Sequence, residues 1–416
     1  MITIFILIQS FMTPTPDPVR RPNEAAALFV FNTLCLTAIM AFMPVIGPVV
    51  RGLRLAEWHG GLVVTVAGVL WMLMARYWGG RSDRVGRRRV LLRAAAGYIV
   101  SYLLLAIGLD LMLREPPPAW LALLALMALR ALLGAFYAAM PTVSAARIAD
   151  ITAPEQRGAM MARLGAANGL GMVLGPAIGG LLVKDSLTLP LYIAAVLPLL
   201  GTLWLAAKLP SDAAHEPRVT PPLKLSDRRL RLPLAAMLLA MSAVITAQMI
   251  VGFYAMDALR QEPGPAARTA GWAMSTVGVM LILVQVGLAK ARRMNAARCL
   301  AGGALLSGVG FLLVPVLGGA WGLVACYAIM AAGMGLVFPS IQTLAANAVT
   351  ADEQGIAAGS VIAVQGMAMV VAPLVCTLLY GVRPWMPYVV AASLLLLVAL
   401  AAAVQPRQPL SARTMP

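Results

Sequence analysis

Charged residues are scarce in this sequence, and acidic residues are the scarcest. Only 12% of the 416 residues are charged, and 16 Asp and Glu stand against 32 Lys and Arg. Hydrophobic residues make up 61% of the chain, whereas a soluble domain has roughly 45–50%. A water-soluble fold of this length cannot bury so many apolar side chains. The composition therefore excludes an ordinary soluble protein.

Cysteine and histidine are almost missing as well. The two histidines lie near predicted loops, and no Walker A pattern occurs. We therefore expect no metal, no nucleotide or other cofactor and, because no nucleophile–base constellation appears, no enzyme. The four cysteines lack the spacing of a disulfide framework or a metal site: Cys35, Cys299, Cys326 and Cys376.

Long apolar segments dominate the sequence instead. Twelve of them reach the roughly 20 residues that a bilayer-spanning helix needs. Backbone polar groups in lipid must be satisfied within the segment, so each is predicted to be a helix. The predicted fold class is an all-α membrane protein. The spans are 25–50, 58–79, 89–113, 119–147, 158–183, 188–208, 233–258, 269–290, 296–318, 320–348, 354–380 and 385–405.

The basic residues lie mostly on one side of these spans. Three quarters of the 32 Lys and Arg fall in the terminal segments and in the loops after the second, fourth, sixth and eighth spans. By the positive-inside rule, both termini are predicted to be cytoplasmic. The net charge of +16 is then a topology signal. We expect a lipid bilayer as partner and no nucleic acid.

The chain divides into two similar halves. Residues 135–156 align without gaps with residues 333–354, and "GLGMVLGP" (169–176) matches "GMAMVVAP" (366–373). Such repeats mark secondary transporters, whose substrate site lies between the halves. Either Met1 or Met12 is the true start. The predicted organisation is an N-terminal tail (1–20), a six-helix bundle (21–208), a cytoplasmic linker (209–232), a second six-helix bundle (233–408) and a tail (409–416).

A glycine- and arginine-rich stretch, "GGRSDRVGRRR" (79–89), follows the second span. Its glycines permit a tight reversal, and its single acid can meet a helix N-terminus and nearby arginines. It resembles the signature of the major facilitator superfamily, in its twelve-helix drug:proton antiporter branch, although Arg81 replaces a common apolar residue. The resemblance covers residues 20–405. It implies a cytoplasmic latch between the halves made of Gly79, Asp83, Arg84, Gly86, Arg87 and Arg88.

A second glycine motif lies in the fifth predicted span. It resembles the antiporter signature GxxxGPxxGG at every fixed position, and the resemblance implies export. Its glycines at i, i+4 and i+8 make one smooth face for close helix packing, and its proline invites a bend. The motif residues are Gly171, Gly175, Pro176, Gly179 and Gly180.

Arg130 is the only basic residue placed deep in a predicted span. The segment around it resembles a further family pattern, with Leu133 in place of a glutamine. Charges at this depth usually face the bundle interior, although an Arg near the interface can also snorkel outward. We expect Arg130 to face the substrate cavity. Six amides are expected to line it too, or else to bond between helices: Asn32, Asn168, Gln248, Gln285, Gln342 and Gln365.

Proton exchange, driven by the proton gradient, is implied by the family resemblance. The available proton carriers are Asp110, Asp257 and Glu24, each with an alternative role as an interfacial residue. The first span has no carboxylate, so the cavity is not expected to favour lipophilic cations.

The sequence thus predicts a monomeric exporter of a small organic molecule in a bacterial cytoplasmic membrane. An anionic or polar metabolite such as a siderophore is the expected substrate. The alternatives are a multidrug efflux pump, an uptake permease for a sugar or organic acid, and a membrane sensor or enzyme.

Overall fold

The computed structural model describes residues 22–153, 156–183, 186–210, 227–290, 295–350 and 353–404. The predicted tails, the question of Met1 or Met12 as the start, and most of the predicted linker lie outside the described residues. Within the described residues, twelve helices are long and apolar enough to cross a membrane, and no strand occurs. The predicted all-α membrane fold is confirmed.

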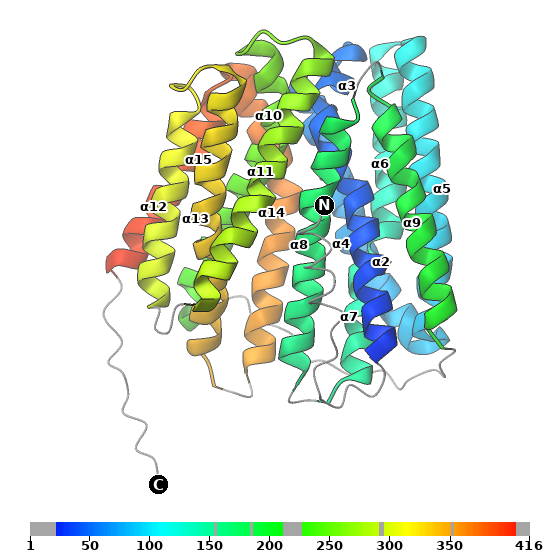
Figure 1. Cartoon of the computed structure of the whole chain (residues 1–416), viewed down its shortest axis with the longest axis vertical. Helices are drawn as coiled ribbons and strands as arrows, with labels where there is room; N and C mark the ends of the chain where they lie inside the picture. Colours follow the sequence, from blue (N-terminus) through cyan, green and yellow to red (C-terminus); the bar gives the residue numbers. More distant parts are fainter. Residues whose placement is uncertain are drawn as a thin grey trace.

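The helices run side by side along one common direction (Figure 1). The first six spans are formed by α2 (Pro22–Met40) with η1 (Met43–Val45) and α3 (Ile46–Gly52), α4 (Glu57–Val85), α5 (Arg87–Arg114), α6 (Ala119–Tyr137) with α7 (Ala139–Ile151), α8 (Arg157–Leu181) and α9 (Leu189–Lys208). The last six are formed by η3 (Arg228–Leu230) with α10 (Arg231–Asp257), α11 (Pro263–Lys290), α12 (Ala296–Leu313), α13 (Gly319–Asn347), α14 (Gln354–Val382) and α15 (Met386–Val404).

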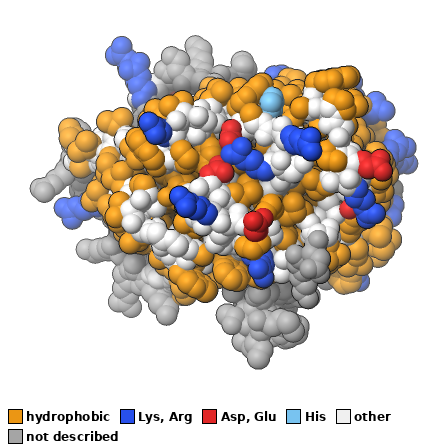
Figure 2. Space-filling view, turned by 90° about the horizontal axis from the view of Figure 1, so that it is seen from above, with side chains coloured by type: hydrophobic (Ala, Val, Ile, Leu, Met, Phe, Trp, Pro, Cys, Tyr) orange, Lys and Arg blue, Asp and Glu red, His pale blue; other side chains and the backbone are white. Residues whose placement is uncertain are grey.

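Two ends of the bundle are distinguished from here on. The basic face, at the bottom of Figure 1, holds the α4–α5 junction and the end of α7, and is defined by Arg87, Arg147 and Arg229. The Arg51 face is the opposite end, where α3 lies. Figure 2 looks onto the Arg51 face and shows acidic and basic side chains next to each other near its centre.

The turn between α4 and α5 is much tighter than predicted. Instead of a loop over residues 80–88, α4 continues to Val85 and α5 begins at Arg87. Gly86 alone separates them, with φ 101°, a conformation that glycine adopts without a Cβ clash. Gly79 and Gly80 lie inside α4 and make no turn, so their predicted role in the reversal is wrong.

The first span is broken where one continuous helix was predicted. Helix α2 ends at Met40, and the chain passes through η1 before α3 begins. Pro44 lies at this break. Because proline has no backbone N–H, it cannot donate to the carbonyl of Met40 as a continuous helix would require.

Each half is built on its own set of helix contacts. In the first half α2 packs on α8 and α9, and α4 packs on α6. In the second half α12 packs on α13 and α15, and α10 packs on α14. Buried tyrosines reinforce this packing: the Tyr98 hydroxyl donates to the Cys35 carbonyl at 2.9 Å, and the Tyr327 hydroxyl donates to the Ala247 carbonyl at 2.6 Å. The halves meet through α4 with α14, α8 with α11, and α3 with α10.

The contact between the halves is closed at the Arg51 face and open toward the basic face. Along α8, a Cβ added at Gly180 would collide with the backbone of Gly271 on α11. About three and four turns nearer the basic face, a Cβ added at Gly169 or Gly165 would meet nothing within 4 Å. The same helix is therefore packed against the other half at one end and separated from it at the other.

Helices α4 and α14 show the same closure near the Arg51 face. A Cβ at Gly61 would collide with the Thr377 side chain and the Pro373 carbonyl. One turn further in, the Thr65 hydroxyl donates to the Val370 carbonyl at 2.8 Å. Two of the helix pairs that join the halves are thus in backbone-level contact on this side.

Candidate functional site

A cavity of about 400 Å³ lies between the two halves. This volume falls within the roughly 300–1,000 Å³ range of sites for drug-sized ligands. Gly165 of α8 is exposed and belongs to the lining, so the cavity reaches the part of α8 that stands apart from the other half. The rest of its wall comes mainly from α10, α11 and α13 of the second half.

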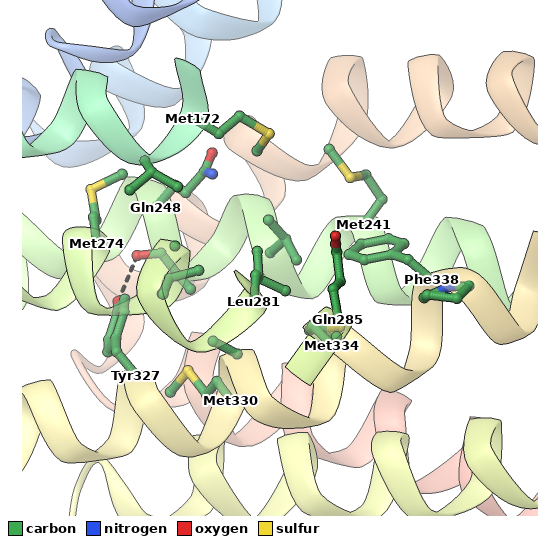
Figure 3. A pocket seen from close by; sticks show the side chains of 18 of the residues that line it. Met172, Met241, Gln248, Met274, Leu281, Gln285, Tyr327, Met330, Met334 and Phe338 are labelled. Atoms are coloured by element: carbon green, nitrogen blue, oxygen red, sulfur yellow. Dashed lines mark hydrogen bonds between the residues drawn. The ribbon is translucent and has the colours of Figure 1, made fainter. Parts of the chain in front are cut away.

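Methionine side chains form much of this wall (Figure 3). Methionine is unbranched and polarizable, so it adapts its shape to different ligands and makes favourable contacts with aromatic rings. Phe311, Tyr327 and Phe338 add aromatic surface. The lining methionines are Met172, Met237, Met241, Met274, Met330 and Met334.

The polar groups of the cavity are mostly amides. Figure 3 shows Gln248 between Met172 and Met274, and Gln285 beside Phe338 and Met334. Gln342 and Gln365 line the cavity as well. The Tyr327 hydroxyl uses its own proton in a bond to the Ala247 carbonyl, so it is not a free donor in the cavity. The glutamine amides, which both donate and accept hydrogen bonds, are the groups placed to bind a ligand.

No charged side chain is found among the described residues that line the cavity. No group of three His, Cys, Asp or Glu that could hold a metal ion occurs in the described part of the chain. The cavity can therefore offer apolar contact, aromatic contact and neutral hydrogen bonds, but no full charge, to a bound molecule.

Two of the six predicted amides lie elsewhere. Asn32 is buried in α2, and its amide donates to the Leu28 carbonyl of the same helix at 2.8 Å. Asn168 is partly buried on α8 and does not line the cavity. Of the two helices, only α8 contributes residues to the cavity lining. The rotation of each helix, which the sequence does not fix, turns them away.

Arg130 does not line the cavity either, contrary to the prediction. It is 3% exposed on α6, which packs against α4 and α5 within the first half. Its guanidinium lies over the ring of Phe42, 4.6 Å from the centroid. Its Nε and Nη1 have no hydrogen-bond partner among the described residues. The inference of an anion-favouring cavity therefore loses its physical basis.

The glycine- and arginine-rich motif forms a network inside the first half. The Arg87 guanidinium binds the Asp83 carboxylate at 2.5 Å and the Asp150 carboxylate of α7 at 3.1 Å. Arg88 donates to the Ala206 carbonyl of α9 at 3.0 Å, and Arg84 is exposed. These bonds join α4, α5, α7 and α9. Among the described residues these bonds all lie within the first half, and the predicted latch between the halves stays a prediction.

The antiporter motif on α8 has two packing faces. A Cβ at Gly171 or Gly175 would come closer than 2.9 Å to α2, and a Cβ at Gly179 would collide with Ala41, directly after α2. These glycines therefore let α8 pack closely against the first span. Gly180 points the other way and packs against Gly271 of α11 in the second half. Pro176 lies inside the helix. The motif therefore shapes both the first half and its seal with the second.

The three predicted proton carriers are all held by arginines outside the cavity. Asp110 pairs with Arg114 at 2.9 Å, and Glu24 pairs with Arg147 at 2.8 Å, both within the first half. Asp257, at the end of α10, pairs instead with Arg51 of the first half at 2.9 Å.

One charged cluster at the basic face was not singled out from the sequence. Arg229 binds Glu353 at 2.9 Å and Asp227 at 2.8 Å. Hydrogen bonds from Arg229, and from the backbone and hydroxyl of Thr350, lower the pKa of Glu353 to about 2. Hydrogen bonds from Arg229 likewise lower the pKa of Asp227. The cluster fastens the start of α10 to the start of α14.

The methionine lining was also missed, although the sequence carried a signal. Met237 and Met241, like Met330 and Met334, are spaced i, i+4 and so share a helix face. With 25 methionines in the chain, such pairs are not specific by themselves. Only their convergence on one cavity distinguishes them.

Comparisons with known proteins agree on the kind of molecule. The model of the Major Facilitator Superfamily matches residues 25–255 and 236–414. The chain is 27% identical over 378 residues to the tetracycline resistance protein, class C, of Escherichia coli, covering 86% of this chain and 90% of that protein. It is 29% identical over 337 residues to the class D protein of Salmonella ordonez, covering 78% and 80%. The crystal structure of the human organic anion transporter MFSD10 (TETRAN) superimposes with a TM-score of 0.66 at 20% identity, covering 93% of this chain and 100% of that one.

Proposed function

Because the chain belongs to the major facilitator superfamily, we propose that this multi-pass membrane transporter exports an uncharged, drug-like organic molecule by alternating access, in exchange for protons. The observation that carries the proposal is the uncharged, methionine-rich cavity between the halves, sealed at the Arg51 face and open toward the basic face. The positive-inside rule predicts that the basic face is cytoplasmic. With that orientation, a cavity open toward the basic face is the inward-facing state of an exporter.

The direction of transport is inferred from the α8 motif and from the relatives. Gly171, Gly175 and Gly179 give α8 the close approach to α2 that the antiporter signature calls for. Tetracycline resistance proteins resemble this chain over most of its length. Both features favour drug export over the uptake of a sugar or an organic acid. A bacterial cytoplasmic membrane is the location we propose.

The substrate class follows from the lining. Six methionines and three aromatic residues offer polarizable apolar surface, while four glutamines offer neutral hydrogen bonds. An anionic siderophore would enter without a cationic partner, and a lipophilic cation without an anionic one. No lining residue favours the siderophore over a neutral drug, so the drug is the substrate class that we propose.

Transport into inside-out membrane vesicles tests this function. We expect energised vesicles to take up a neutral aromatic dye more strongly than matched anionic or cationic dyes, and vesicles without the protein to take up none. Uptake that persists after nigericin collapses the pH gradient would contradict proton exchange. A preference for the anionic dye would contradict the substrate class and leave export itself standing.

A further inference from the structure

We propose that Arg51, Glu57, Asp257 and Tyr380 form a proton-sensitive lock, which holds the two halves closed at the Arg51 face and releases them when Asp257 is protonated. The inference rests on the alternating access of the proposed function and on no particular substrate. Arg51 and Asp257 act here as positioning residues of the transport cycle.

The lock joins four elements from both halves. Asp257, at the end of α10, accepts a bond from Arg51 of α3 at 2.9 Å, and its Oδ2 also accepts a bond from the Tyr380 hydroxyl of α14 at 2.8 Å. Arg51 binds Glu57, at the start of α4, through the same Nη2 atom. Arg51 and Glu57 belong to the first half, whereas Asp257 and Tyr380 belong to the second.

The lock sits where the halves are already in contact. Helices α4 and α14 meet at Gly61 and Thr377, and α8 meets α11 at Gly180 and Gly271. These contacts involve glycines, a threonine and backbone groups, none of which titrates, so they do not depend on pH. The Arg51–Asp257 pair adds a charge-dependent bond across the same seam.

One added proton changes the charge balance of the lock. Two carboxylates, Asp257 and Glu57, share one guanidinium, so the group carries a net charge of −1 when both are ionised. One proton on Asp257 makes the group neutral.

The geometry determines which carboxylate releases the halves. When Asp257 takes up a proton, Arg51 keeps Glu57, its partner in its own half, and loses its attraction to the second half. Protonating Glu57 instead would leave Arg51 bound to Asp257 and the seam closed. Release therefore depends on Asp257. With Asp257 30% exposed, the proton comes from the solution at the Arg51 face and returns to it on closure.

His59 is a further titratable group beside this cluster. It lies on α4 next to Glu57, and its Nδ1 accepts a hydrogen bond from the Ala56 N–H at 2.9 Å. In the described part of the chain it makes no hydrogen bond with Arg51 or Asp257. A His59→Gln variant therefore separates a histidine sensor from the carboxylate sensor proposed here.

A spin-label distance across the Arg51 face tests the lock without any substrate. Trp120 at the start of α6 and Val316 before α13 are 65% and 72% exposed, in opposite halves. Both are changed to cysteine in a full-length protein whose four native cysteines are replaced by alanine, and the distance is measured in nanodiscs between pH 5 and pH 8. We expect the longer distance to gain population as the pH falls.

Two variants of the lock should shift the pH dependence of opening in opposite directions. Asp257→Asn should show the longer distance several-fold more often at pH 8 and should lose the pH dependence. Glu57→Gln should move the opening midpoint to lower pH, because Asp257 then has Arg51 to itself. Asp110→Asn is the matched control, since Asp110 lies at the same face but pairs within the first half. It should behave as the parent, as should His59→Gln.

Two results would overturn the lock. One is an Asp257→Asn protein that keeps the parental pH dependence. The other, decisive if that variant does not fold, is a Glu57→Gln midpoint that moves to higher pH. Vesicle transport measured on the same proteins keeps the two proposals apart. A parent that opens with pH but exports no drug contradicts the proposed function alone, and a parent that exports with a pH-insensitive distance contradicts the lock alone.

Discussion

Arg130 shows how little the presence of a buried charge says about where it points. Its guanidinium is buried against Phe42 and lies outside the cavity, whereas Gln248 on α10 lines it. A buried arginine on the predicted fourth span could be foreseen from the sequence. The direction of its side chain could not, because a rotation of α6 by half a turn would leave the hydropathy pattern almost unchanged.

The two side chains should therefore differ in their effect on substrate binding. We expect Gln248→Leu to raise the half-saturating drug concentration about fivefold, because a lost hydrogen bond costs about 1 kcal/mol. Arg130→Met should leave that concentration nearly unchanged, whatever it does to the maximal rate. Initial rates of vesicle uptake over a range of drug concentrations give both values. A larger shift for Arg130→Met than for Gln248→Leu would return Arg130 to the site.

The lowered pKa of Glu353 should make the stability of the protein depend on pH at the basic face. Its pKa, lowered to about 2 from 4.5 by Arg229 and Thr350, lies below the ordinary value, so its contribution to stability is complete above about pH 4.5 and is lost as the pH falls toward 2. Glu353→Gln should lower the unfolding temperature at neutral pH, and the difference from the parent should shrink below pH 4.5. Thermal unfolding in detergent across this range measures it. A difference in unfolding temperature that grows as the pH falls below 4.5 would contradict this role of Glu353.

Among the elements, α8 carries the sharpest contrast. Gly175 and Gly169 lie on the same helix, but a Cβ at Gly175 would collide with the Met40 side chain and come within 2.6 Å of the Thr37 carbonyl, while a Cβ at Gly169 meets nothing within 4 Å. The sequence predicted the close-packed face correctly from its i, i+4, i+8 spacing. It could not show that Gly180 would face the other half, because that depends on tertiary contacts.

The two glycines should respond differently to the same substitution. Gly175→Ala should destabilise the protein by about 1–3 kcal/mol, the usual cost of overpacking, and reduce export. Gly169→Ala, the matched control, should cause no loss of stability, because its Cβ meets no neighbour and alanine is the better helix former. Unfolding temperature and vesicle transport report the two effects. Equal losses in both variants would mean that impaired membrane insertion is responsible and that packing against α2 is not.

At the scale of the whole molecule, the fold was the most predictable feature. Apolar length alone set the number and approximate limits of the spans, and the repeat between residues 135–156 and 333–354 indicated two related halves. The cavity and the lock could not be predicted from the sequence, because both depend on contacts between distant segments. Arg51 and Asp257 are 206 residues apart in the chain. No local pattern relates them.

The central claim also concerns the whole molecule: one cavity between the halves is exposed to one side of the membrane at a time. Gln342 lines the cavity on α13, in the part of the molecule where α8 stands free of the second half. A single cysteine at this position, in a protein without native cysteines, reports which side reaches it.

The decisive measurement is the labelling of Gln342→Cys by a membrane-impermeant thiol reagent, compared between inside-out vesicles and right-side-out cells at pH 8. We predict rapid labelling from the basic face and almost none from the Arg51 face, with Asp257→Asn added to the same protein making the cysteine reactive from the Arg51 face. Equal labelling from both sides, or labelling from the Arg51 face alone in the protein that retains Asp257, would contradict the account.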